Sequence, residues 1–266
     1  MTSAATQHAL WDRVVCGIDG TPASLDAAHC AARLMPAASR LTLCTVVDPS
    51  VIDRDASSEQ RLTRQAEAAL DEAERQVGGL HDAELHLREG NPVRMLLEEL
   101  RAERATLVAV GSNGDGRAGG VALGSVTTSM LHQAPCSVLV SHGRPHQEPE
   151  LGGEIVVGFD GSGGARRALA AGRQLSERLQ ARLHVIVALG GAITAPELPW
   201  LSEDLEDELT TVTEDSRPPV EALAEASRSA ALVILGSRHL PGILAALASV
   251  SERTAHRTIC PALIVR

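Results

Sequence analysis

Residues 111–125, with the sequence GSNGDGRAGGVALGS, could form a phosphate-binding loop. They follow the apolar run ATLVAV, which predicts a buried strand. Gly111, Gly114 and Gly116 would let the backbone turn with positive φ and approach a ligand closely, so that its N–H groups form an anion nest. The usual phosphate loop ends in Gly-Lys-Ser/Thr, whereas this chain contains no lysine. Phosphate binding would therefore depend on backbone N–H groups, with Arg117 as the nearby fixed cation.

The pair Gly124-Ser125 closes this loop and would open the next helix. The unpaired N–H groups and the dipole of a helix start favour a phosphate. The Ser125 hydroxyl could cap the helix, bind a phosphate oxygen, or share the two roles.

Asp19 is the second candidate, because it ends the apolar run RVVCGID. An ionised carboxylate only accepts hydrogen bonds, so Asp19 could take one from an exocyclic amine or from a ribose hydroxyl. It could equally cap the next helix, which Thr21-Pro22 predicts, with Thr21 as N-cap and Pro22 at the first helical position.

Composition limits the classes of partner. The net charge is −10, which argues against nucleic acid as a partner, because nucleic-acid binders present a basic surface. No stretch approaches the ~20 uninterrupted apolar residues of a membrane span, and the first residues lack the pattern of a signal peptide. Five cysteines without metal-ligand spacing indicate reduced thiols and a cytoplasmic protein. The only aromatic residues are Trp11, Phe159 and Trp200, so a nucleobase would have to be held without aromatic stacking.

The chain repeats itself. RVVCGIDGTPASLDAA (13–28) matches EIVVGFDGSGGARRAL (154–169), LVAVGSNG matches LVILGSRH, and GSVTTSMLHQAPCSVLV matches ASVSERTAHRTICPALIV. Three matched blocks in the same order indicate a tandem duplication. The polar, Pro- and Gly-containing segment 141–153 predicts the linker. We therefore expect two domains, residues 1–143 (the first half) and residues 151–266 (the second half).

Strands and helices should alternate within each half. The predicted strands of the first half are 13–19, 41–47, 84–88, 105–110 and 137–141, and the predicted helices are 22–35, 58–77, 92–103 and 125–133. This alternation predicts an α/β fold of two tandem Rossmann-like, flavodoxin-like domains, each with a five-stranded, mostly parallel sheet in the order 3-2-1-4-5 and helices on both faces. In that order Asp19 and the loop at Gly111 meet where the strand order reverses, which is where such sheets bind ligands. The second half should have a truncated second helix.

The spacing Gly111-x2-Gly114-x9-Gly124-Ser125, with VVCGIDGT before it and HQAPCSVLV after it, resembles the universal stress protein family, and in particular its tandem-domain, ATP-binding members. The resemblance implies ATP as ligand, either alone or with Mg2+. It implies that Asp19 and the backbone of Val46 bind the adenine, that Gly17 packs beneath the nucleoside, and that the loop and helix start surround the ribose and phosphates. The loop and helix residues so implied are Gly111, Ser112, Asn113, Gly114, Gly116, Arg117, Gly124, Ser125 and Val126.

The second half departs from that pattern. Asp160, Gly236 and Ser249 match Asp19, Gly111 and Ser125, but His239 stands in place of the second glycine and Ala248 in place of Gly124. A side chain where glycine was needed should crowd the loop, so we expect a weakened or lost site. The resemblance also implies that the last strands of the two halves pair within the chain, as they would across a dimer, and that two such chains could form a homodimer.

Three functions of different classes follow. The first is a cytoplasmic, nucleotide-binding regulatory protein of the stress response, without turnover. The second is a slow ATPase, or a protein that binds AMP or cyclic AMP in the same pocket. The third is a nucleotide-independent scaffold. No nucleophile–base pair, paired carboxylates or metal motif emerges from the sequence, which disfavours an enzyme.

Overall fold

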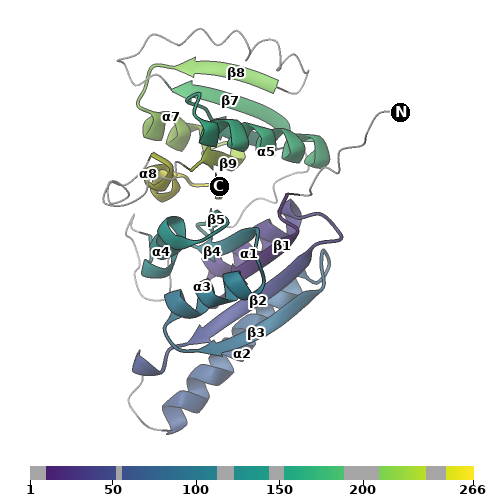
Figure 1. Ribbon diagram of the computed structural model, residues 1–266, viewed down its shortest axis with the longest axis vertical. Helices are drawn as coiled ribbons and strands as arrows, with labels where there is room; N and C mark the ends of the chain where they lie inside the picture. Colours follow the sequence, from purple (N-terminus) through teal and green to yellow (C-terminus); the bar gives the residue numbers. More distant parts are fainter. Residues whose placement is uncertain (1–9, 52–55, 113–122, 144–152, 189–209, 238–249) are drawn as a thin grey trace.

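The computed structural model describes residues 10–51, 56–112, 123–143, 153–188, 210–237 and 250–266 (Figure 1). Strands and helices alternate along the first half, close to their predicted positions. Its elements are β1 (Arg13–Gly17), α1 (Pro22–Leu34), β2 (Arg40–Val47), a 3-10 turn (Pro49–Val51), α2 (Ala56–Val77), β3 (Ala83–Glu89), α3 (Pro92–Ala102), β4 (Leu107–Gly111), α4 (Ser125–Gln133) and β5 (Ser137–Ser141).

The second half repeats this order. Its described elements are β6 (Glu154–Gly158), α5 (Gly163–Leu179), β7 (Arg182–Ala188), β8 (Thr210–Asp215), α7 (Pro219–Ala226), β9 (Ala230–Gly236), α8 (Val250–Arg257) and β10 (Ala262–Val265). The predicted truncation of its second helix concerns residues 189–209, which lie outside the described part of the chain.

The ten strands of the described residues form one sheet in the order β3-β2-β1-β4-β5-β10-β9-β6-β7-β8. Each half thus has the predicted order 3-2-1-4-5. The pairs within each half are parallel, and β5 and β10 pair antiparallel at the centre, with Leu139 opposite Leu263. The implied pairing of the two last strands within the chain is confirmed. Figure 1 shows the first half, from purple to teal, on one side of this seam and the second half, from green to yellow, on the other.

Helices cover both faces of the sheet, which explains why its central strands are almost continuously apolar. On one face α1, α2 and α5 pack on a single core cluster that includes residues of both halves, among them Cys16, Leu107, Leu139, Val157 and Leu263. On the other face α3 and α4 cover the first half, and α7 and α8 cover the second.

The start of α1 follows the predicted rule. Thr21 is the N-cap, its side chain accepts a hydrogen bond from Ser24 N, and Pro22 occupies the first turn. Strand β1, however, ends at Gly17 and not at Asp19 as predicted. Gly20 has φ +80°, and this left-handed residue turns the chain from the strand into the helix.

Candidate functional site

The carboxyl ends of β1 and β4 form the candidate site of the first half. The two strands are hydrogen-bonded neighbours, with Gly17 opposite Val110. Since β2 lies on one side of this pair and β5 on the other, the strand order reverses here, and the segments that leave β1 and β4 diverge. The structure therefore brings the Asp19 segment and the Gly111 segment to one edge of the sheet, as the strand order predicted.

Asp19 is exposed and lies two residues beyond the end of β1. Its Oδ1 atom accepts hydrogen bonds from Thr21 N at 3.0 Å and from Thr21 Oγ1 at 2.6 Å. The carboxylate thus holds the N-cap residue but is not itself the N-cap. Among the described residues Oδ2 receives no hydrogen bond, so one carboxylate oxygen supports the turn and the other can accept from a ligand.

Val46 lies near the end of β2, and its backbone extends past the last residue of β1. The Cys44 carbonyl accepts a bond from Ile18 N on the β1 side, and the Val47 carbonyl accepts one from Gly90 N on the β3 side. Because backbone groups alternate between the two sides of a strand, the N–H and C=O of Val46 point to the β1 side. The β1–β2 pairing ends at Gly17 opposite Cys44, so this donor and acceptor face the crevice beside Asp19.

The two glycines at the strand ends have a packing role. A Cβ on Gly17 would lie 3.2 Å from Leu96 Cδ2, and a Cβ on Gly111 would lie 2.7 Å from Ser24 N, in the backbone of α1. Gly111 does not have a positive φ, so the expectation that it supplies a left-handed turn is wrong. Glycine is needed there because α1 rests directly on the end of β4.

Ser112 fixes both ends of the glycine-rich loop. Ser112 is buried; its N–H donates to the Ser141 carbonyl at 2.6 Å, and its carbonyl accepts from Gly124 N at 2.7 Å. The residues between, including the predicted ligands Asn113, Gly114, Gly116 and Arg117, lie outside the described part of the chain.

Helix α4 begins directly after the hydrogen bond between Gly124 N and the Ser112 carbonyl. Gly124 is its N-cap, without a side-chain capping bond, and Ser125 and Val126 are the first two helical residues. Ser125 is exposed and does not cap the helix, so that alternative is wrong. The N–H of Gly124 is already paired with Ser112. Those of Ser125 and Val126 lack an intrahelical acceptor because of their position in the first turn, and they are the donors that the helix start offers.

Three buried hydroxyl side chains link the ends of β1 and β4 to the neighbouring elements. The sequence did not single them out. Ser24 Oγ accepts from Asp19 N at 3.3 Å, Thr45 Oγ1 donates to the Ile18 carbonyl at 2.7 Å, and Thr127 Oγ1 donates to the Gly111 carbonyl at 2.5 Å. The repeat offers a signal for one of them, because Ser251 matches Thr127 and donates to the Gly236 carbonyl at 2.8 Å.

At its strand ends the second half repeats the turn after the first strand but differs in the partner of the carbonyl that follows β9. Asp160 Oδ1 accepts from Ser162 N at 3.0 Å, as Asp19 does from Thr21. Arg167 Nη2 donates to the Ser237 carbonyl at 3.3 Å, whereas the matching carbonyl of Ser112 accepts from Gly124 N at the start of α4. The predicted departures at His239 and Ala248, and the matching Ser249, lie outside the described residues.

A charged network lies beside this site, between β3 and α3. The buried Glu99 accepts from His86 Nδ1 at 2.5 Å and from Arg88 Nε at 2.7 Å. Burial raises the pKa of Glu99, but the bonds from Arg88 and His86 outweigh it, so the pKa is lowered overall. His86, Glu99 and Glu103 place potential metal ligands within 4.8 Å of one another. Because Arg88 and His86 already donate to the two Glu99 oxygens, the geometry favours an ion-pair network over a metal site.

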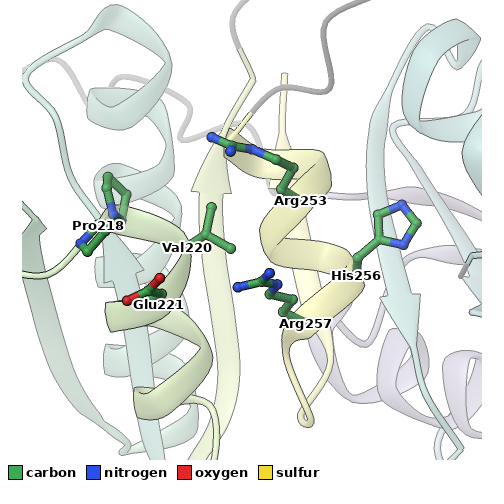
Figure 2. Close-up of a pocket in the computed structure, with 7 residues that line it drawn as sticks. Pro218, Val220, Glu221, Arg253, His256 and Arg257 are labelled. Carbon is green, nitrogen blue, oxygen red and sulfur yellow. The ribbon is translucent and has the colours of Figure 1, made fainter. Parts of the chain in front are cut away.

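A cavity of about 410 Å³ lies elsewhere, between α7 and α8 of the second half (Figure 2). Its lining comes from the start of α7 and from α8, and consists of Pro218, Pro219, Val220, Glu221, Arg253, His256 and Arg257. None of its lining residues belongs to β1, to β4 or to the segments that follow these strands.

The cysteines of the described chain are free thiols. Burial raises the pKa of Cys44, Cys136 and Cys260 to about 12 in each case. These thiols are therefore protonated at neutral pH and act as small apolar side chains. Among the described helices none has the length and apolar character that a membrane crossing requires.

Known proteins with similar sequences and a similar fold belong to one family. A sequence model of the Universal stress protein family matches residues 10–142 and 200–266. A universal stress protein of Mycolicibacterium smegmatis is 26% identical over 298 aligned positions, which cover 100% of this chain and 99% of that protein. One from Mycobacterium tuberculosis is 29% identical over 188 positions, which cover 61% of this chain and 62% of that protein. The crystal structure of a universal stress protein from Archaeoglobus fulgidus has a TM-score of 0.77 at 19% identity, covering 96% of this chain and 98% of that one.

Proposed function

Because this chain belongs to the universal stress protein family, we propose that its first half binds ATP as a regulatory ligand in a stress response. Membership of the family agrees with the α/β fold of two halves. The choice of ATP as ligand, however, depends on the candidate site at the ends of β1 and β4. One observation supports it above all: a carboxylate, a strand-end backbone and a helix start meet where the strand order reverses between β1 and β4.

Each part has a matching part of the nucleotide. Asp19 Oδ2 would accept from the exocyclic amine of adenine, and the backbone of Val46 would pair with the ring edge. Gly111 and Ser112 would lie under the ribose and the first phosphates. The N–H groups of Ser125 and Val126, at the positive end of the α4 dipole, would bind the phosphate tail. Mg2+, where it is present, would accompany the phosphates.

In this proposal residues 1–143 form the nucleotide-binding domain and residues 151–266 form a domain whose own site is weakened or lost. In this proposal the protein binds ATP without turning it over, because the sequence motif carries no nucleophile–base pair. Its free, protonated thiols suit the reducing cytoplasm, where we place it. A dimer of such chains is part of the same proposal.

The test is isothermal titration calorimetry of the full chain with ATP, using Asp19→Asn and a matched control in the second half. Asparagine keeps the Oδ1 acceptor that holds Thr21 but replaces Oδ2 with a donor. We expect Asp19→Asn to weaken ATP binding by at least about tenfold, because a hydrogen bond to a charged acceptor is lost. Asp160→Asn, at the matching position, should leave the affinity unchanged. Equal affinity of Asp19→Asn and the unaltered protein would contradict the proposal.

A second variant tests the phosphate end of the site. Ser125→Asp places a negative charge on an exposed residue of the first helical turn, where the helix dipole favours it. The fold should therefore keep its stability while the new charge repels the phosphates and abolishes ATP binding. Unchanged binding would exclude the start of α4 from the site.

The same titrations separate the other functions. Tighter binding of AMP or cyclic AMP than of ATP would assign a monophosphate ligand. Phosphate release over many turnovers, lost in Asp19→Asn, would make the protein an ATPase. Failure to bind any adenine nucleotide would favour a scaffold.

A further inference from the structure

The end of the glycine-rich loop in the first half is held by the second half. Leu123 directly precedes Gly124, the N-cap of α4, and its N–H donates to Nδ1 of His256 at 3.3 Å. The Leu123 side chain packs on Ala255, Ala262 and Ile264, a cluster of the second half. Backbone and side chain of this loop residue are thus both anchored across the seam.

The two consecutive amides at the loop end have partners from opposite halves. Leu123 N bonds to His256 of α8, and Gly124 N bonds to the Ser112 carbonyl at the other end of the same loop. Together these bonds fix where α4 begins. The donors that we assign to the phosphates, the N–H groups of Ser125 and Val126, follow directly.

The matching histidine of the first half has a different contact. His132 occupies the position in α4 that His256 occupies in α8, and its Nε2 lies 3.3 Å from Oε1 of Glu252 in α8; the two side chains are 38% and 13% exposed. His256 instead accepts a backbone N–H, which requires an unprotonated Nδ1. In Figure 2 its ring points away from Val220 and Glu221, on the other side of α8 from the Arg253 and Arg257 side chains.

We infer that His256 is a positioning residue for the nucleotide site of the first half, and that the second half supports that site through it. This inference rests on the proposed function. A phosphate-binding turn that is held in place before the ligand arrives binds more tightly, because the cost of ordering it is not paid on binding. The second half would then contribute to nucleotide binding even though its own motif departs from the family pattern.

The experiment compares His256→Ala, His256→Asn and His132→Ala in the full chain. Asparagine can place its Oδ1 near the position of Nδ1 and so keep the acceptor. The first readout is amide hydrogen exchange of residues 123–128 without nucleotide. It should be faster in His256→Ala and unchanged in the other two variants.

The second readout is ATP affinity by calorimetry. His256→Ala should weaken binding about three- to tenfold, the cost of one hydrogen bond, and His256→Asn should restore it. Unchanged amide hydrogen exchange in His256→Ala would show that His256 does not hold the loop end. An equal loss of ATP affinity in His132→Ala would show that any loosening of the contacts between the halves weakens binding. If the unaltered protein does not bind ATP, the proposed function is wrong. If it binds ATP and His256→Ala binds it as tightly, only the positioning role is wrong.

Discussion

The ionisation of Glu99 is closely tied to its surroundings. Its side chain is 2% exposed, and its two oxygens accept from His86 and Arg88. Replacement by glutamine keeps the shape but removes the charge that both donors face. We expect Glu99→Gln to lower the free energy of unfolding at pH 7 by about 2 kcal/mol, the value of a hydrogen bond to a charged group.

This loss should depend on pH. The pKa of Glu99 is lower in the folded protein than its ordinary value, so the folded state holds its proton less tightly than the unfolded state. The stabilisation is present in full above the ordinary glutamate pKa and is lost as the pH falls through the lower, folded-state pKa. Urea unfolding of both proteins from pH 7 into the acid range should therefore show their difference shrinking. Glu98→Gln, on the exposed face of α3, should change stability by less than about 0.5 kcal/mol, and a Glu99 difference that is constant with pH would contradict the prediction.

The placement of individual residues at the candidate site could be predicted where the order of the strands determines it. Asp19 and Gly111 are examples, because strand order places both at one edge of the sheet. The reason for Gly111 could not be predicted, since it is the contact with Ser24 and not a left-handed φ. Ser24 and Glu99 gave no local signal, because their partners are set by how α1 and α3 pack on the sheet.

At the scale of elements, the contact between α1 and β4 decides the shape of the crevice. The first turn of α1 approaches the end of β4 so closely that Gly111 has no room for a Cβ. The second half repeats this contact between Gly236 and Gly164, the matching pair. Strand and helix positions were predictable from periodicity and from caps such as Thr21. The closeness of the elements was not, because it depends on small residues that belong to different elements.

Gly111→Ala should therefore destabilise the protein whether or not a nucleotide is present. The added methyl would lie 2.7 Å from Ser24 N and 2.8 Å from the Ala23 carbonyl carbon, which forces α1 away from β4. Overpacking of this kind costs about 1–3 kcal/mol. The measurement is chemical denaturation without ligand, with Gly79→Ala as control, since a Cβ there meets nothing within 4 Å. A stable Gly111→Ala that has only lost ATP binding would show that the glycine serves the ligand and not the packing.

At the scale of the whole molecule, the two halves form one body related by an approximate two-fold axis. The axis passes between Leu139 and Leu263, which match each other in the repeat and pair directly in the sheet. Such self-complementary pairing is what a symmetric dimer uses. Contacts on both sides of the sheet reinforce it: Arg178 of α5 donates to the Leu34 carbonyl at the end of α1, and Arg266 donates to the Ala134 carbonyl at the end of α4.

Because β5 and β10 join the two halves in one sheet, we expect the whole chain to unfold in a single transition. Leu139 and Leu263 are both 0% exposed and belong to one core cluster with residues of both halves. Leu139→Ala and Leu263→Ala should each cost about 3 kcal/mol, and nearly the same amount, because each leaves a cavity at a matching position beside the axis.

Scanning calorimetry should show one transition in both variants, at a lower temperature than in the unaltered protein, with calorimetric and van't Hoff enthalpies that agree. Leu80 is 46% exposed, so Leu80→Ala should change the free energy of unfolding by less than about 0.5 kcal/mol. Two transitions, with only one shifted by each substitution, would show that the halves unfold independently.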